Sequence, residues 1–359
     1  MLVFFTALFI AVFAAYLARK STSKVMSRCL LGIAFITMVL VPTLRSIRVG
    51  TDSREYVGYF NSIKSFPDVL SVGKTMGEYG FWTLDWLLHY VSDDYIILFF
   101  AIAVICVGCY QRAIVENSES IEISYFIYFT MGNYSFFFNG ARQGIACAIY
   151  VLAVGQILKK NFIKYAALVL LAFFFHKTAI MMLPMYFILN RPNTFKSNLI
   201  TLAIGCVAIL SINTIVGVAS SFDERYAAYG NSGEGGGYLT FAFGLILSTF
   251  FLLFKNSVRI GEREYGIFLN MFLFATMIGG VSSFLGVNPS GLLRYGTYFD
   301  QASIFLWPLV FKNISDRFQK FVIGYSLVAV QLVFFVLTTY RFSDRLPYEF
   351  NPMILNLFK

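Results

Sequence analysis

Long apolar stretches recur along the whole chain, and they constrain its fold more than any other feature of the sequence. An α-helix needs about 20 apolar residues to cross a bilayer, and fewer where neighbouring helices or membrane thinning help. Of the 359 residues, 58% are apolar and only 13% are charged. This balance excludes a soluble globular enzyme, a disordered chain and a coiled coil. We therefore predict an all-α, polytopic bundle of transmembrane helices.

The apolar stretches predict about twelve spans. Their approximate limits are 2–18, 29–44, 95–111, 121–138, 141–158, 162–176, 177–190, 199–220, 238–254, 265–287, 297–311 and 321–339. No soluble domain, low-complexity linker or clear repeat interrupts them. We therefore expect a single integral membrane domain over residues 1–359.

The basic residues predict the orientation of the chain in the membrane. Arg19, Lys20, Lys24 and Arg28 follow the first span, and no basic residue precedes it, so its N-terminus is expected outside. If each following span crosses the membrane in the opposite direction, the basic segments at 191–196 and 255–263 lie in the cytoplasm. The same alternation places one large loop, about 45–94, and a second loop, about 221–237, on the periplasmic or extracellular side. We expect short amphipathic helices in the first loop and a glycine-rich flap in the second.

Two outer segments share one short pattern. Arg225-Tyr-Ala-Ala-Tyr229 and Arg294-Tyr-Gly-Thr-Tyr298 both fall at predicted span ends, and on a helix the arginine and the second tyrosine would share a face. An arginine fork suits a diphosphate, and a tyrosine ring suits a sugar. The alternative is that these residues are ordinary interface anchors.

Arg142 lies in the segment Phe138-Asn-Gly-Ala-Arg-Gln-Gly144, where Asn139 could cap a helix. A cation in the first turn of a helix opposes the helix dipole unless an anion is bound there. The position therefore predicts an anion site, although an arginine reaching toward lipid headgroups fits the same pattern.

Two residues could act as a general base on the outer side. His176 follows an apolar run and precedes Lys177, and an ionisable residue at membrane depth usually faces a cavity. Asp52 is flanked by Arg48 and Arg54, which should keep it ionised and hold the loop. A charged turn without chemistry is the alternative for Asp52.

The sequence predicts no metal and no cofactor. It has two histidines and five cysteines, with no zinc-ligand spacing among them. Nucleotide-binding glycine motifs are also absent from the sequence. The net charge of +9 is attributed to cytoplasmic loops, and nucleic acid is not an expected partner.

Four motifs, in this order, resemble the EpsG-like branch of the Wzy polysaccharide polymerases. They are Arg48-Val-Gly-Thr-Asp52-Ser-x-x-Tyr56, Glu78-Tyr-Gly-Phe81, Phe138-Asn-Gly-Ala-Arg142-Gln-Gly-Ile-Ala146 and Ala172-Phe-Phe-Phe-His176-Lys-Thr-Ala-Ile180. Arg294-Tyr295 and Pro347-Tyr348 extend the likeness toward the end of the chain. One departure is Ala141, where the family more often has a bulky apolar residue.

The resemblance implies a glycosyltransferase of the bacterial inner membrane whose active site faces the periplasm. It would join oligosaccharide repeat units carried on undecaprenyl diphosphate, both as donor and as acceptor, and a chain-length regulator of the Wzz type could be a partner. The sequence assigns Arg142, Arg225 and Arg294 to the diphosphate, with His176 as the first candidate for the base and Asp52 as the second. The remaining candidates contact the sugars or form the covering loop: Arg48, Arg54, Glu78, Gln143 and Tyr295.

Two other functions remain open at this stage. A flippase for the same lipid-linked sugars would also need many spans and a cationic cavity, but on both sides of the midplane and with two similar halves. A membrane O-acyltransferase acting on surface glycans could use His176 as its base.

Overall fold

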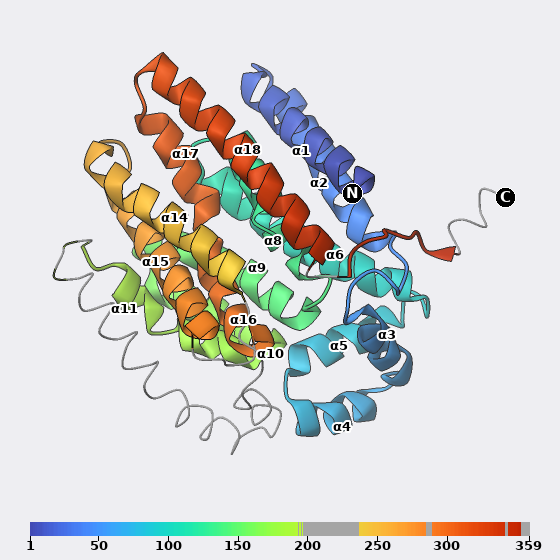
Figure 1. The fold of residues 1–359 in the computed structure, drawn as a ribbon. Helices are drawn as coiled ribbons and strands as arrows, with labels where there is room; N and C mark the ends of the chain where they lie inside the picture. The colour runs from blue at the N-terminus through green and yellow to red at the C-terminus, as the bar shows by residue number, and fades with distance from the viewer. Residues whose placement is uncertain (193, 195, 197–236, 285–288, 342–343, 353–359) are drawn as a thin grey trace. The chain divides into compact units, whose positions relative to one another are not determined.

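The computed structural model describes residues 1–192, 194, 196, 237–284, 289–341 and 344–352. Regular secondary structure in these residues is helical, and strand-like pairing is limited to one bridge between Arg45 and Phe350. The helices (Figure 1) are α1 Leu2–Lys20, α2 Lys24–Thr43, α3 Ser53–Ser62, α4 Phe66–Met76, α5 Tyr79–Leu88, α6 Tyr95–Asn117, α7 Ile121–Thr130, α8 Asn133–Phe136, α9 Ala141–Leu158, α10 Phe162–Phe175, α11 Met185–Leu189, α14 Tyr238–Phe254, α15 Glu262–Phe284, α16 Pro289–Asp300, α17 Ser303–Asn313 and α18 Arg317–Arg341. The all-helical prediction is therefore confirmed for the described residues.

Seven helices in the described part of the chain are long and apolar enough to cross a membrane, which identifies a multi-pass membrane protein. The spans are Leu2–Lys20, Lys24–Thr43, Tyr95–Asn117, Ala141–Leu158, Tyr238–Ser257, Glu262–Phe284 and Arg317–Tyr340. The predicted number of about twelve is not confirmed.

The difference in span number has local causes in the described residues. The stretch 121–138 is divided at Gly132, whose φ of 86° ends α7 and begins the one-turn α8. The stretch 177–190 forms a 3-10 helix, Lys177–Met182, and the five-residue α11, with Pro184 between them. The stretch 297–311 is shared by α16 and α17, and α10 has only 14 residues. The predicted span 199–220 and the loop 221–237, up to residue 236, lie outside the described residues.

The chain divides into two compact units. Unit 1 contains residues 1–183 and 314–359, and unit 2 contains residues 184–313. In unit 1, α1 packs on α2 and α7, α2 packs on α6, and α6 packs on α9. Helices α9 and α10 form an antiparallel hairpin closed at Lys159–Asn161, so the start of α9 and the end of α10 lie at the same end of the unit.

The large loop 45–94 contains three short helices, as predicted. Figure 1 shows α3, α4 and α5 gathered at one end of unit 1, where α5 packs on α4, α3, α6 and α10. Each helix buries one face: α3 buries Tyr56 and Phe60, and α5 buries Phe81, Trp82 and Asp85. The side of the membrane on which the loop lies remains a prediction.

The C-terminal segment crosses the end of α2 and the start of this loop. The backbone N–H groups of Ser46 and Gly50 donate to the carbonyl oxygens of Glu349 and Asp344, each at 2.8 Å. The hydroxyl of Tyr348 donates to the carbonyl of Val41 at 2.6 Å. Because these bonds join segments about 300 residues apart in sequence, the C-terminal segment fixes the position at which the loop begins.

In unit 2, α15 is the central helix and contacts α11, α14, α16 and α17. Its core contains aromatic pairs such as Phe268 with Phe305, stacked at 4.8 Å. Trp307 packs against Phe250 and Phe251 of α14 at 5.2 and 5.1 Å. The single integral membrane domain over residues 1–359 stays a prediction.

Candidate functional site

Glu78 lies between two basic side chains that come from different helices. Its Oε2 accepts a hydrogen bond from Nη1 of Arg142 at 2.7 Å, and its Oε1 lies 2.5 Å from Nδ1 of His176. The side chain of Glu78 is 2% exposed, that of Arg142 16% and that of His176 21%. A buried carboxylate is therefore bound by two basic side chains, and each of these side chains is partly exposed.

The backbone at Glu78 has an uncommon conformation. Glu78 precedes α5 with φ 59° and ψ 40°, the left-handed region, and Gly77 before it has φ 68°. For a residue with a Cβ, this conformation costs about 1–2 kcal/mol. A Cβ at Gly77 would also collide with the side chain of Lys177. The close approach of Gly77 to Lys177 brings the start of α5 against the residue that follows His176.

The start of α9 positions Arg142. Gly140 precedes α9, and Arg142 is the second residue of the helix. Gly144 allows this turn to pack on Phe137, where a Cβ would collide. Asn139 does not cap the helix, because its Oδ1 accepts from the backbone N–H of Thr51 at 3.2 Å. The turn before α9 is therefore held by the loop that begins at Arg45.

The guanidinium of Arg142 also faces two aromatic rings. It lies 5.3 Å from the ring centre of Trp82 and 5.9 Å from that of Tyr56, within the range of a cation–π interaction. Trp82 is itself fixed, since its indole N–H donates to the carbonyl of Gly77 at 2.7 Å. Arg142 thus has an ionic partner and an aromatic wall. Binding of a separate anion by this arginine stays a prediction.

His176 follows α10 directly and has an extended backbone, with φ −154° and ψ 120°. An ionised carboxylate only accepts hydrogen bonds, so Nδ1 of His176 donates to Glu78. In the neutral imidazole, Nε2 then carries the lone pair. A carboxylate that fixes a histidine in this way prepares the second nitrogen to accept a proton.

Asp85 lies on α5, three residues after Trp82 and on the same side of the helix. It is completely buried, and both carboxylate oxygens lack a hydrogen-bond partner among the described residues. Burial raises the pKa of Asp85 well above its usual value, and the positive charge of Arg142 opposes this in part. Burial therefore favours the neutral form of Asp85, whose carboxyl group interacts electrostatically with Arg142.

Arg45 supports the site from behind the turn that precedes α9. Its guanidinium lies between the rings of Phe99 and Phe138, at 4.2 and 4.3 Å, and donates to the carbonyl of Phe138 at 3.4 Å. Burial lowers the pKa of Arg45 to about 9. Arg345 of the C-terminal segment donates to the hydroxyl of Ser135 at 2.6 Å. Two buried or half-buried arginines therefore hold the segment 135–138.

The other predicted residues of unit 1 lie in the segment before α3, in the first turn of α3 and in the first turn of α9. Asp52 precedes α3 and accepts a hydrogen bond from the hydroxyl of Thr51 at 2.7 Å. Arg48 lies 3.8 Å from the carboxylate of Glu349, and Arg54 is exposed. Gln143 is buried in the first turn of α9. The structure brings together Glu78, Arg142 and His176, and their roles in the reaction remain predictions.

Three of the predicted site residues belong to unit 2. Arg294 and Tyr295 are half-buried on α16. Arg225 lies outside the described residues. The roles of both arginines stay predictions.

Sequence reasoning treated Glu78 as a residue of the covering loop and missed its bridging position. It also gave no role to Trp82, Asp85 or Arg45. One signal was available: Trp82 and Asp85 are three residues apart, which places an indole and a carboxylate on one face of a helix.

The comparison with known families identifies the chain. The sequence model of the EpsG family matches residues 28–350, which is most of the chain and includes every residue of the site just described. The chain belongs to the EpsG family, a family of exopolysaccharide and O-antigen polymerase-like membrane proteins. No curated protein and no solved structure matched the sequence.

Proposed function

We propose that this protein is a Wzy-type polysaccharide polymerase of the bacterial inner membrane. It joins oligosaccharide repeat units carried on undecaprenyl diphosphate, at a site that faces the periplasm. The observation that carries the proposal is Glu78 held between Arg142 and His176, in a chain that belongs to the EpsG family.

The reaction transfers the growing glycan from its lipid diphosphate to a hydroxyl of the incoming repeat unit. The hydroxyl oxygen bonds to the anomeric carbon of the donor, the bond from that carbon to the diphosphate breaks, and undecaprenyl diphosphate leaves with the electron pair. The proton of the hydroxyl must go to a base. We assign this role to Nε2 of His176, because Glu78 occupies Nδ1. Asp52 remains the second candidate.

Arg142 is assigned to the departing diphosphate. One of its nitrogens is bound by Glu78, and its side chain keeps 16% exposure, so further guanidinium N–H groups are available for oxygens of a bound anion. Charge on the diphosphate increases as the glycosidic bond breaks, and a donor fixed in advance stabilises that charge most. Arg225 and Arg294 are proposed to share this role. Arg48, Arg54, Gln143 and Tyr295 are proposed to contact the sugars or form the covering loop.

Reconstitution tests the assignment of the base. The full chain in vesicles is given the lipid-linked repeat unit, and the products are separated by chain length. His176→Gln should abolish polymerisation while lipid-linked substrate still binds. His89→Gln is the matched control, because His89 also belongs to unit 1 and is also paired with a carboxylate, that of Asp93, at 2.6 Å. Equal activity of the two variants, at equal amounts of folded protein, would remove His176 from the mechanism.

Gene deletion separates the proposed function from the two alternatives. A polymerase defect leaves surface glycan as single repeat units. A flippase defect removes surface glycan completely, and loss of an O-acyltransferase leaves the chain length normal while acyl groups disappear. Either of the last two outcomes would overturn the proposal.

A further inference from the structure

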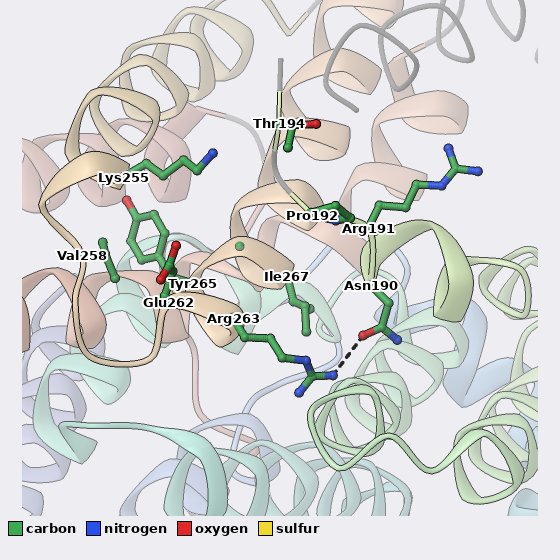
Figure 2. A pocket seen from close by; sticks show the side chains of 11 residues that line it. Asn190, Arg191, Pro192, Thr194, Lys255, Val258, Glu262, Arg263, Tyr265 and Ile267 are labelled. Atoms are coloured by element: carbon green, nitrogen blue, oxygen red, sulfur yellow. Dashed lines mark hydrogen bonds between the residues drawn. The ribbon is translucent and has the colours of Figure 1, made fainter. Parts of the chain in front are cut away.

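A cavity with charged side chains in its lining lies in unit 2, and the proposed polymerase reaction gives it no role. It has a volume of about 550 Å³ and is formed by three segments. These are the end of α11 with the residues after it, the link between α14 and α15, and the first turns of α15. Figure 2 shows side chains from all three segments around the opening.

The lining of this cavity is cationic. Arg191, Lys255 and Arg263 contribute three positive charges, and Glu262 contributes one negative charge. The net charge of these four residues is 3 − 1 = +2, in a cavity large enough for a phosphate group with its substituents. Such a site favours an anion, and two arginines offer the planar fork that matches phosphate oxygens.

The polar wall is fixed by hydrogen bonds within unit 2. Nη2 of Arg263 donates to Oδ1 of Asn190 at 3.0 Å, as the dashed line in Figure 2 shows. Asn190 in turn donates to the carbonyl of Tyr186 at 3.0 Å. Asn270 is buried and donates to the carbonyl oxygens of Leu189 and Arg191 at 3.3 and 3.0 Å. These bonds hold the wall of the cavity before any ligand binds.

The position of the cavity in the chain points to a membrane ligand. Tyr238–Ser257 and Glu262–Phe284 are consecutive candidate spans, so the link between them lies at a membrane–water interface, where lipid phosphates are found. The helices and the link that form the cavity also carry exposed apolar side chains: Leu253 of α14 is 75% exposed, Ile260 of the link 48%, and Phe187 of α11 62%. Cations at headgroup depth together with apolar side chains match a lipid that has an anionic head and acyl chains.

We propose that this cavity, defined by Arg191, Lys255 and Arg263, binds the phosphate headgroup of an anionic phospholipid. The sequence analysis predicts that both basic segments face the cytoplasm, which would make the ligand a lipid of the inner leaflet. Binding would hold the end of α11 against the start of α15. The proposal is independent of the polymerase assignment, since it uses no residue of that site.

Lipid binding by the purified full chain tests this proposal. The protein is delipidated in a neutral detergent, and its melting temperature and bound lipid are measured with phosphatidylglycerol, with phosphatidylcholine and with inorganic phosphate. Phosphatidylglycerol should bind and raise the melting temperature, and phosphatidylcholine should not. Removing two cations, in Arg191→Ala/Lys255→Ala, should weaken phosphatidylglycerol binding by about 30-fold, since each basic residue contributes about fivefold.

Two further variants control for charge and for folding. Arg317→Ala/Lys320→Ala removes two exposed cations at the start of α18 and should leave binding unchanged. Arg191→Lys/Lys255→Arg keeps the charge and should retain most of the affinity. Equal binding of the two lipids, or wild-type affinity in the Arg191→Ala/Lys255→Ala variant, would overturn the proposal. Stabilisation by inorganic phosphate with no added effect of phosphatidylglycerol would overturn the lipid assignment.

Discussion

Two glutamates in unit 1 hold the same kind of contacts in opposite surroundings. Glu78 joins Arg142 and His176 at 2.7 and 2.5 Å, and its side chain is 2% exposed. Glu116, at the end of α6, joins Arg112 and Lys159 at 2.9 Å each, and its side chain is 36% exposed. The distances barely differ, so the contrast between the two clusters lies in the solvent around them.

Solvent decides what each cluster contributes to stability. Water screens the charges around Glu116, and an exposed ion pair contributes about 0–1 kcal/mol. At Glu78 little water can replace a lost partner, so removing one member leaves an uncompensated buried charge. The fold therefore needs all members of the buried cluster for its stability, and the same cluster is the candidate active site.

The largest expected effect is that of Glu78→Ala. It leaves the half-buried Arg142 without its ionic partner, and we expect the free energy of unfolding to fall by about 3–5 kcal/mol. Chemical denaturation in detergent measures the change. Glu116→Ala, the matched variant in the exposed cluster, should differ from wild type by less than about 1 kcal/mol. Equal losses in the two variants would show that burial does not distinguish the clusters.

The second effect is on turnover. Arg142→Ala should reduce polymerisation by about 10²–10³-fold, the usual result of removing one donor arranged in advance. Donor binding should weaken far less, because the interaction is strongest in the transition state. Arg142→Lys should recover part of the rate, since an ammonium lacks the planar fork.

Arg112→Ala is the control for the turnover measurement, because it removes an exposed arginine of the same unit. Rates are compared at equal amounts of inserted protein. If properly inserted Arg142→Ala still produced full-length glycan, the assignment of Arg142 to the diphosphate would be wrong. Arg142 would then be an arginine that reaches toward lipid headgroups.

The third prediction concerns pH and Asp85. Its pKa is raised in the folded protein, so folding favours the neutral acid while the unfolded chain ionises above about pH 4. Stability from this group is therefore highest at low pH and declines as the pH rises toward the folded pKa. Asp85→Asn stays neutral at all pH values. Relative to wild type, its free energy of unfolding should rise as the pH increases above about 4, by up to about 1.4 kcal/mol per pH unit.

Unfolding of both proteins at several pH values checks this prediction. A constant difference between Asp85→Asn and wild type would mean that Asp85 is ionised in the folded protein. Thr83→Ala, elsewhere on α5, is a control that leaves the titrating group in place.

The smallest effect is expected in the exposed cluster. Lys159→Ala should change the free energy of unfolding by about 0.2–1 kcal/mol, and added salt should reduce even this difference. Salt should have much less influence on the loss caused by Glu78→Ala. A strong salt dependence of the Glu78→Ala effect would show that water reaches the buried cluster.

The sequence predicted the class of fold because apolar length is a local property. Helices such as α1, α2 and α6 need no tertiary information to be recognised. The breaks were harder to predict, since Gly132 and Pro184 interrupt stretches that are otherwise apolar enough to continue. Short helices that depend on packing cannot be distinguished from spans by composition alone.

The site was predictable in its residue types and not in its contacts. Arg142 and His176 were identified because charged or titratable groups are uncommon beside apolar runs. The bridge through Glu78 depends on a left-handed residue before α5 and on Gly77 packing against Lys177. Neither feature follows from the pattern of polar and apolar residues. Burial of Asp85 likewise depends on how three short helices pack.

If His176 is the base, as proposed, the length of α10 affects the route by which an acceptor would reach it. The 14 residues of α10, at about 1.5 Å each, give a rise of about 21 Å, whereas the hydrocarbon core is about 30 Å thick. A helix that starts at one face of the membrane therefore ends well below the opposite headgroups. An acceptor anchored in the bilayer can slide sideways to that depth, while a free sugar in the aqueous phase would have to descend to it. The shortness of one helix would thus select tethered acceptors before any sugar is recognised.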